Sequence, residues 1–71
     1  MEPKYIQIYF FNNPNYKYFV NCYYEYEFNS NGQPIFLHVD KVNANGEEER
    51  HTYPLTNVER VVERKMRHDE Q

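Results

Sequence analysis

The feature that most limits how this chain can fold is an unbroken alternation of apolar residues between Tyr16 and Phe28. Side chains of a β-strand point alternately to its two faces, so this alternation predicts one long strand whose even-numbered face is buried. The odd-numbered face is mixed, because Phe19 and Tyr23 interrupt its polar residues. The predicted buried face consists of Tyr16, Tyr18, Val20, Cys22, Tyr24, Tyr26 and Phe28.

The length and composition of the chain favour one small β-rich domain. A chain of 71 residues buries only ~60% of the surface that it exposes when unfolded. We therefore expect a single domain over residues 1–71, with residues 1–3 and 68–71 disordered. Tyrosine and phenylalanine make up 18% of the chain, whereas alanine occurs once and glycine twice, and this composition favours strands over helices.

Cysteine content and charge exclude several classes of protein. Cys22 is the only cysteine, so no intramolecular disulfide can form. No stretch resembles a signal peptide or a membrane span, and we expect a cytoplasmic protein with no membrane partner. The net charge of −3 argues against general nucleic-acid binding. Residues 60–71 hold four bases against three acids, which we interpret as a solvated end rather than a basic docking arm.

Turn signals divide the chain into consecutive strands. Residues 12–15, with the sequence NNPN, should connect a first strand over residues 4–11 to the long second strand. Residues 29–32 and 43–46 both read Asn-x-Asn-Gly, and Asn-Gly between alternating runs is a strong hairpin signal. The second, third and fourth strands should therefore form an antiparallel meander.

The apolar pattern also predicts how these strands are aligned, because a slip of one residue sends every side chain to the opposite face. We expect a two-residue turn at Asn31-Gly32, and a three-residue loop that closes in a glycine bulge at Gly46. The first turn predicts the cross-strand pairs Phe28–Ile35, Tyr26–Leu37, Tyr24–Val39, Glu25–His38 and Tyr23–Asp40. The second predicts the pairs Ile35–Leu55, Leu37–Tyr53, Val39–His51 and Asp40–Arg50.

The segment after Pro54 has two possible structures. Thr56 and Glu59 form a helix capping box, and the valines at positions 58, 61 and 62 fall on one helical stripe with Met66. The Pro-Leu-x-x-Val sequence from Pro54 to Val58, followed by Val-Val, instead resembles the short connection before the last strand of SH3-like and other small barrels. That resemblance implies a turn and a fifth strand, which we favour because valine prefers strands.

The expected fold is therefore mostly β, an antiparallel meander of four to five strands that could form a partly open SH3-like barrel. The alternative is an α+β fold in which a C-terminal amphipathic helix packs on a four-stranded sheet.

The sequence offers no set of residues for catalysis, metal binding or a cofactor. His38, Asp40, Glu49 and His51 resemble a metal site, but the bulged register places the first two on the opposite face from the last two. We expect His38 beside Glu25, and His51 at the edge of the core. Cys22 lies in the apolar row and should be a buried, unreactive thiol. We therefore predict a protein that is not an enzyme and has no metal or cofactor.

An excess of apolar residues on the first two strands suggests a binding surface. If the even-numbered residues face the core, pairing of these strands puts Ile6, Ile8, Phe10, Phe19 and Tyr23 together on the opposite face. Such a patch is either covered by the C-terminal segment or used as a protein interface. Our preferred hypothesis is a small interaction module that binds another protein, or a second copy of itself, through these residues.

Two further functions are compatible with the sequence. Single-stranded nucleic acid could stack on Phe10, Phe19, Tyr23 and Phe36, although the few lysines argue against it. Abundant Asn, Tyr, Phe, Lys and Ile is typical of AT-rich codons, and with the small size this suggests a phage or mobile-element accessory protein that inhibits a host enzyme.

Overall fold

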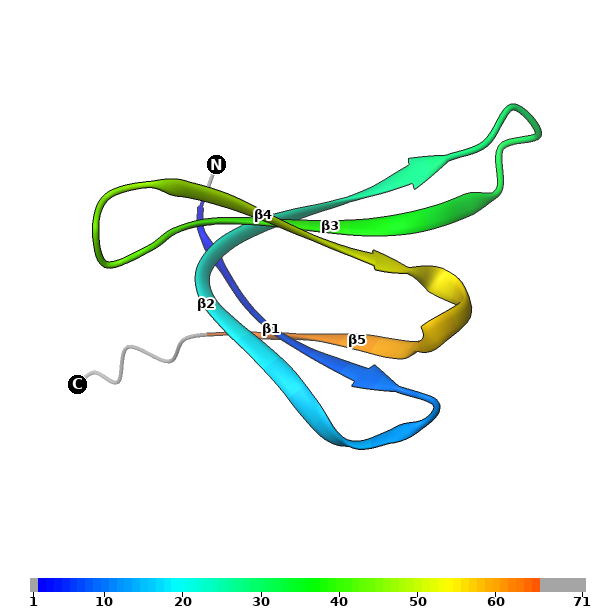
Figure 1. Cartoon of the computed structure of the whole chain (residues 1–71), viewed down its shortest axis with the longest axis horizontal. Helices are drawn as coiled ribbons and strands as arrows, with labels where there is room; N and C mark the ends of the chain where they lie inside the picture. Colours follow the sequence, from blue (N-terminus) through cyan, green and yellow to red (C-terminus); the bar gives the residue numbers. More distant parts are fainter. Residues whose placement is uncertain (1, 66–71) are drawn as a thin grey trace.

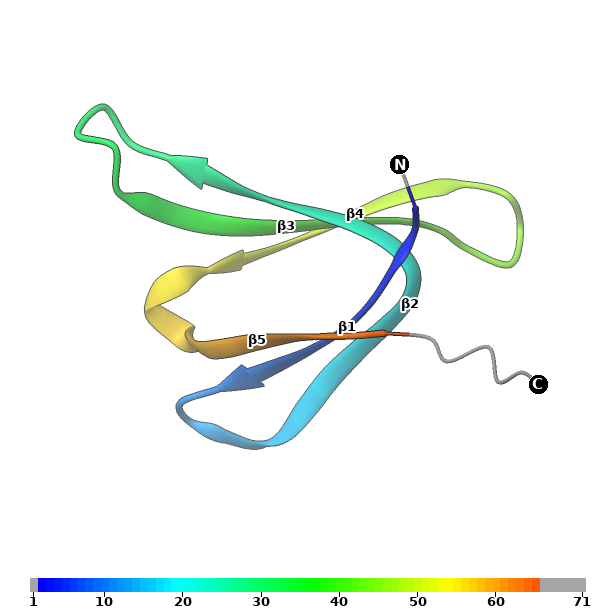
Figure 2. The same cartoon turned by 180° about the vertical axis from the view of Figure 1, so that it is seen from behind.

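The long alternating stretch forms one strand, β2 (Asn13–Phe28), in a computed structural model that describes residues 2–65 (Figure 1). The first half of β2 pairs with β1 (Lys4–Phe10), and its second half pairs with β3 (Pro34–Val42). Because β2 bends between these halves, the two pairings lie in two layers rather than in one flat sheet (Figures 1 and 2).

The remaining elements complete an antiparallel sheet of five strands in the order β4-β3-β2-β1-β5. β4 (Glu48–Pro54) pairs with β3, and β5 (Val58–Arg64) pairs with β1. A single turn of 3-10 helix, η1 (Leu55–Asn57), connects β4 to β5. This arrangement confirms the predicted β meander with a fifth strand.

The alternative of a C-terminal helix is wrong. Val58 is buried in the core and Val61 packs against it, while Val61 also lies opposite Ile8 of β1. These valines are therefore buried by strand pairing with β1, and not by the apolar stripe of a helix. Within residues 2–65 no helix has the length and hydropathy needed to cross a membrane. The disorder predicted for residues 68–71 lies outside the described residues.

The core fills the space between the two layers. Ile6 and Ile8 from β1 and Leu37 and Val39 from β3 have no exposed surface. Partly buried aromatic residues surround this centre, and the rings of Phe10 and Tyr53 lie 5.5 Å apart. The complete set of buried apolar residues is Ile6, Ile8, Phe19, Cys22, Leu37, Val39 and Val58.

The prediction that the even-numbered residues of β2 are buried throughout is wrong. Phe19 is only 7% exposed, whereas Tyr18 is 61% exposed. Asn21 adopts a positive φ of 54°, and the register against β1 shifts there, since Ile6 lies opposite Phe19 but Lys4 lies opposite Cys22. This β-bulge adds one residue and reverses which positions face inward. The residues before it that are exposed contrary to the prediction are Tyr16, Tyr18 and Val20, and after it Tyr26 and Phe28 are also exposed contrary to the prediction.

The two Asn-x-Asn-Gly turns have the same structure. The Asn29 N–H donates to the Gln33 carbonyl at 2.8 Å, and the Asn43 N–H donates to the Glu47 carbonyl at 2.8 Å. In each turn the glycine has a positive φ, as a glycine bulge requires. The loop predicted at Gly46 is confirmed, whereas the two-residue turn predicted at Gly32 is wrong.

The first asparagine of each motif explains the longer loop. The Asn29 side-chain oxygen accepts hydrogen bonds from the backbone N–H groups of Asn31 and Gln33, at 2.9 and 3.0 Å. Asn43 makes the equivalent bonds in the second turn. These bonds fix a loop of three residues, and as a result Phe28 lies opposite Pro34 rather than Ile35.

Most of the predicted strand alignment is confirmed. The pair Ile35–Leu55 does not form in the ladder, because Leu55 belongs to η1. The observed pairs that match the prediction are Tyr23–Asp40, Tyr24–Val39, Glu25–His38, Tyr26–Leu37, Leu37–Tyr53, Val39–His51 and Asp40–Arg50.

Candidate functional site

The structure does not place the predicted interface residues on one surface. Ile6, Ile8 and Phe19 are buried in the core, and Phe10 is half-buried at its margin. Tyr23 is 41% exposed, but it lies in the half of β2 that pairs with β3. The predicted contact patch is therefore wrong, and the physical reason is the bulge at Asn21. The same burial removes Phe19 from the set proposed to stack nucleic-acid bases.

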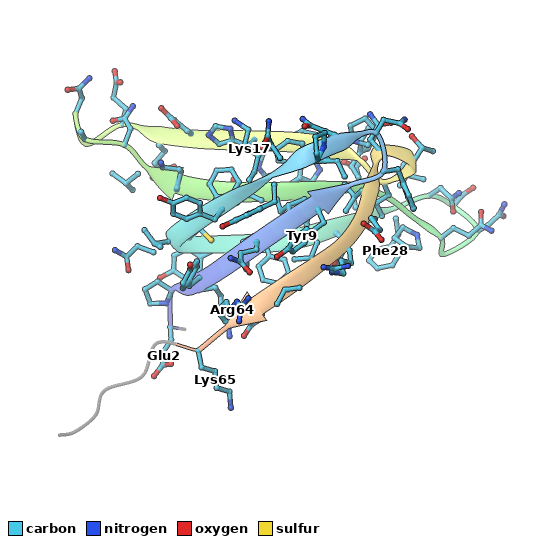
Figure 3. The ribbon with its side chains drawn as sticks, turned by 90° about the horizontal axis from the view of Figure 1, so that it is seen from below. Glu2, Tyr9, Lys17, Phe28, Arg64 and Lys65 are labelled. Atoms are coloured by element: carbon cyan, nitrogen blue, oxygen red, sulfur yellow. The ribbon has the colours of Figure 1, made fainter. Side chains whose placement is uncertain are left out.

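A different set of aromatic residues is exposed on the outer side of β1, β2 and β5. Figure 3 looks onto this part of the sheet, with Tyr9 labelled on β1 and Arg64 on β5. Gln7 of β1 lies opposite Tyr18 of β2 and opposite Val62 of β5, so outward residues of the three strands lie side by side. We call this surface the tyrosine–arginine face, and it comprises Tyr5, Gln7, Tyr9, Tyr16, Tyr18, Val20, Arg60, Val62 and Arg64.

Ring contacts hold the tyrosines of this face in place. Tyr9 and Tyr16 stack with their ring centroids 5.3 Å apart, and Tyr5 meets Tyr18 edge-on at 6.3 Å. The guanidinium carbon of Arg60 lies 4.1 Å from the Tyr9 ring centroid, within the range of a cation–π contact. Since Tyr16 comes from β2 and Arg60 from β5, Tyr9 is covered on both sides. Tyr16 and Tyr18 remain 47% and 61% exposed.

Gln7 lies at the centre of the face and is only 7% exposed. Its side-chain oxygen accepts a hydrogen bond from Nε of Arg64 at 2.9 Å and a longer one from the Tyr9 hydroxyl at 3.4 Å. These bonds orient the Arg64 guanidinium and leave its two terminal nitrogens without an ion pair among residues 2–65. An arginine held in this way can donate both terminal N–H groups to one carboxylate.

The tyrosine–arginine face contains no acidic residue. The two glutamates of β5 alternate with its arginines and point to the other side of the strand. There Glu63 accepts hydrogen bonds from the Tyr24 hydroxyl at 2.8 Å and from Lys4 at 3.2 Å, and both lower its pKa. Glu59 forms a long, exposed ion pair with Arg60 at 3.8 Å. The face is thus locally cationic on a chain whose net charge is −3.

The outer side of the other half of the sheet has its charges paired internally. Arg50 donates to Asp40 at 2.7 and 2.9 Å and to Glu25 at 2.8 Å. The hydrogen bonds from Arg50 hold the pKa of Asp40 below its ordinary value. We call this surface the ion-paired face, and it comprises Tyr23, Glu25, Glu27, Phe36, His38, Asp40, Arg50, Thr52 and Pro54.

His38 occupies the centre of the ion-paired face and is 9% exposed. It lies opposite Glu25 in the strand register, as predicted, but its ring nitrogens contact Glu27 at 2.7 Å and Thr52 at 2.9 Å. His51 faces the core margin, where it contacts Glu49 at 3.0 Å. Among residues 2–65 no three His, Cys, Asp or Glu side chains lie close enough together to hold a metal ion.

Cys22 is fully buried, as predicted. Its thiol contacts the Lys4 carbonyl oxygen at 3.4 Å, and burial raises the pKa of the thiol. The reactive thiolate is therefore disfavoured at this position.

The first strand of the sequence contains a signal for the tyrosine–arginine face. In the first strand, Ile6 and Ile8 alternate with Tyr5, Gln7 and Tyr9. The aliphatic residues fit a core better than residues that carry hydroxyl or amide groups. This contrast identifies the inward face of β1 without any assumption about β2.

Comparison with known proteins finds no protein family, no curated protein and no solved structure that resembles this chain.

Proposed function

We propose that this chain is a small non-enzymatic protein-interaction module whose contact surface is the tyrosine–arginine face. The observation that carries this proposal is the exposure of Tyr16 and Tyr18 beside two arginines on a face without acids. Tyrosine and arginine are enriched among the residues that dominate binding energy at protein interfaces. The ring contacts among the tyrosines reduce the side-chain entropy that is lost on binding.

The arrangement of Tyr9 favours a protein partner over single-stranded nucleic acid. Base stacking needs an accessible ring face. Both faces of the Tyr9 ring are occupied, by Tyr16 and by Arg60. The net charge of −3 also opposes approach of a phosphate backbone. The suggestion of a phage or mobile-element inhibitor stays a prediction from composition.

A selection experiment tests this proposal. The immobilised protein is used to select binders from a display library of random peptides, and their affinities are measured for a variant with Tyr16→Ser and Tyr18→Ser. We expect the dissociation constant to rise about tenfold or more, because exposed interface tyrosines contribute strongly to binding. Circular dichroism checks that the variant remains folded.

A matched control uses apolar residues outside the face. Phe28 and Val42 are 57% and 61% exposed, and Phe28→Ser with Val42→Ser should leave binding unchanged. Binders that depend on Phe28 and Val42 but not on the tyrosines would refute the proposal. Binding of a fluorescent oligothymidylate at ~50 mM salt, lost on removal of the arginines, would instead assign the face to nucleic acid.

A further inference from the structure

β5 is an edge strand that borders the tyrosine–arginine face. On one side it pairs with β1, and on the other side no described strand pairs with it. The backbone N–H and C=O groups along that side can accept an additional strand from a partner. β4 is the other edge strand, but the charges of its outer face are already paired through Arg50.

The charge pattern of β5 defines which strand would fit. Directly opposed residues of antiparallel strands point to the same face. A strand added to β5 would therefore place its outward side chains beside Arg60, Val62 and Arg64, where acidic and apolar residues are favoured. Its inward side chains would lie beside Glu59, Val61 and Glu63, where basic and apolar residues are favoured.

The same pattern opposes pairing of β5 with a second copy of itself. In a two-fold antiparallel pair, residues on one face meet residues on the same face of the partner strand. A pair centred on Val61 places Glu59 opposite Glu63, and a pair centred on Val62 places Arg60 opposite Arg64. A pair centred on Arg60 or on Glu63 places that residue opposite the same residue of the second copy. Every such register opposes like charges, which destabilises the pair.

Both arginines are oriented before any partner binds. Arg60 lies over the Tyr9 ring, and Nε of Arg64 is bonded to Gln7. Less side-chain entropy is therefore lost when they bind carboxylates. We propose that the partner of this module is an extended segment of another protein, which adds a strand to β5 and carries acidic residues opposite Arg60 and Arg64. This inference rests on the proposed function of the tyrosine–arginine face.

A synthetic peptide tests strand addition directly. The sequence Glu-Lys-Val-Val-Glu-Lys places its glutamates opposite Arg64 and Arg60 and its lysines opposite Glu63 and Glu59. Amide hydrogen exchange, followed by NMR on the intact chain, should slow at every second residue of β5 when this peptide is added. A control peptide of the same composition, Lys-Lys-Val-Val-Glu-Glu, can satisfy only one arginine and should protect these amides much less.

Charge reversal gives a second readout. The variant with Arg60→Glu and Arg64→Glu should bind the matched peptide about tenfold more weakly, because two attractive cross-strand pairs become repulsive. A peptide with lysine in place of both glutamates should restore binding to this variant. Both arginines are exposed, and circular dichroism checks that the variant keeps its fold.

Three results would overturn strand addition. They are no binding of the matched peptide at millimolar concentration, binding without slower exchange along β5, and failure of the lysine peptide to restore binding to the reversed variant. None of them affects the dependence of library-selected binders on Tyr16 and Tyr18. The proposed function and this inference can therefore fail separately.

Discussion

The ion-paired face and the tyrosine–arginine face have the same arrangement of strands but differ in how their charged residues are paired. Each comprises three outward residues from each of three neighbouring strands, and each has a buried polar residue at its centre, Gln7 in one and His38 in the other. On the ion-paired face, Arg50 contacts two carboxylates. On the tyrosine–arginine face, Arg64 pairs with no acid among residues 2–65, and Arg60 has only a 3.8 Å ion pair with Glu59. The comparison indicates that the first face is complete within the chain, while the second can accept carboxylates from a partner.

The junction between the two faces is a single residue of β2. Asn21 has a positive φ, which asparagine tolerates better than most residues, and it separates the half of β2 that pairs with β1 from the half that pairs with β3. If β2 were a regular strand without this bulge, Tyr16 and Tyr18 would share a side with Cys22 and face the core. The tyrosine–arginine face therefore depends on the bulge.

Asn21→Pro should have the largest effect, because proline fixes φ at about −65° and excludes the positive φ of the bulge. Without the bulge, Phe19 and Cys22 are three positions apart in a regular strand and point to opposite sides, so one of them leaves the core. We expect loss of the cooperative thermal transition that circular dichroism follows in the intact chain.

The control for this substitution is Asn21→Gly, because glycine accepts a positive φ. We expect it to melt within a few degrees of the parent chain. An Asn21→Pro variant that melts like the parent chain would show that the fold does not need a positive φ at position 21, and would contradict the role given to Asn21.

The fold was largely predictable because its determinants are local. The turn sequences, the alternation in the second half of β2 and the valines of β5 each act within a few residues or between adjacent strands. The length of the first Asn-x-Asn-Gly loop was not predicted correctly. There the side chain of Asn29, rather than Asn31-Gly32 alone, selects the loop.

The candidate site was not predictable in the same way, because it depends on the bulge. The sequence from Tyr16 to Phe28 alternates without a break, and nothing in that pattern marks Asn21 as an inserted residue. A tyrosine can lie in a core margin or on a surface, so the even-numbered tyrosines fit either side. Only the register against β1 shows that Tyr18 faces outward and Phe19 inward.

Two adjacent residues of β2, Tyr18 and Phe19, test which side of the strand faces the core. Phe19→Ala should destabilise the protein by about 3 to 5 kcal/mol, since it leaves a cavity in the core. Tyr18→Ala should cost about 1 kcal/mol or less, because only ring contacts on the surface are lost. Urea unfolding, monitored by far-UV circular dichroism, measures both values. Equal losses for the two variants would contradict the reversal of faces at Asn21.

Acid titration gives the smallest effect and concerns the ion-paired face alone. Arg50 holds the pKa of Asp40 below its ordinary value of 3.8 in the folded chain. A carboxyl group with a depressed folded pKa stabilises the fold fully above its unfolded pKa, and this contribution is lost as the pH falls through the folded pKa. Asp40→Asn should therefore lower the melting temperature by a few degrees at neutral pH, and the difference should shrink below about pH 3.8.

The matched control comes from the opposite face. Arg64 contacts Gln7 and no carboxylate among residues 2–65, so Arg64→Gln should change the melting temperature by a similar small amount at neutral and at acidic pH. If Arg64→Gln shows the same pH dependence as Asp40→Asn, Arg64 must be paired with an acid of its own chain. Its guanidinium would then not be available to a partner, and the contrast between the two faces would no longer support binding at the tyrosine–arginine face.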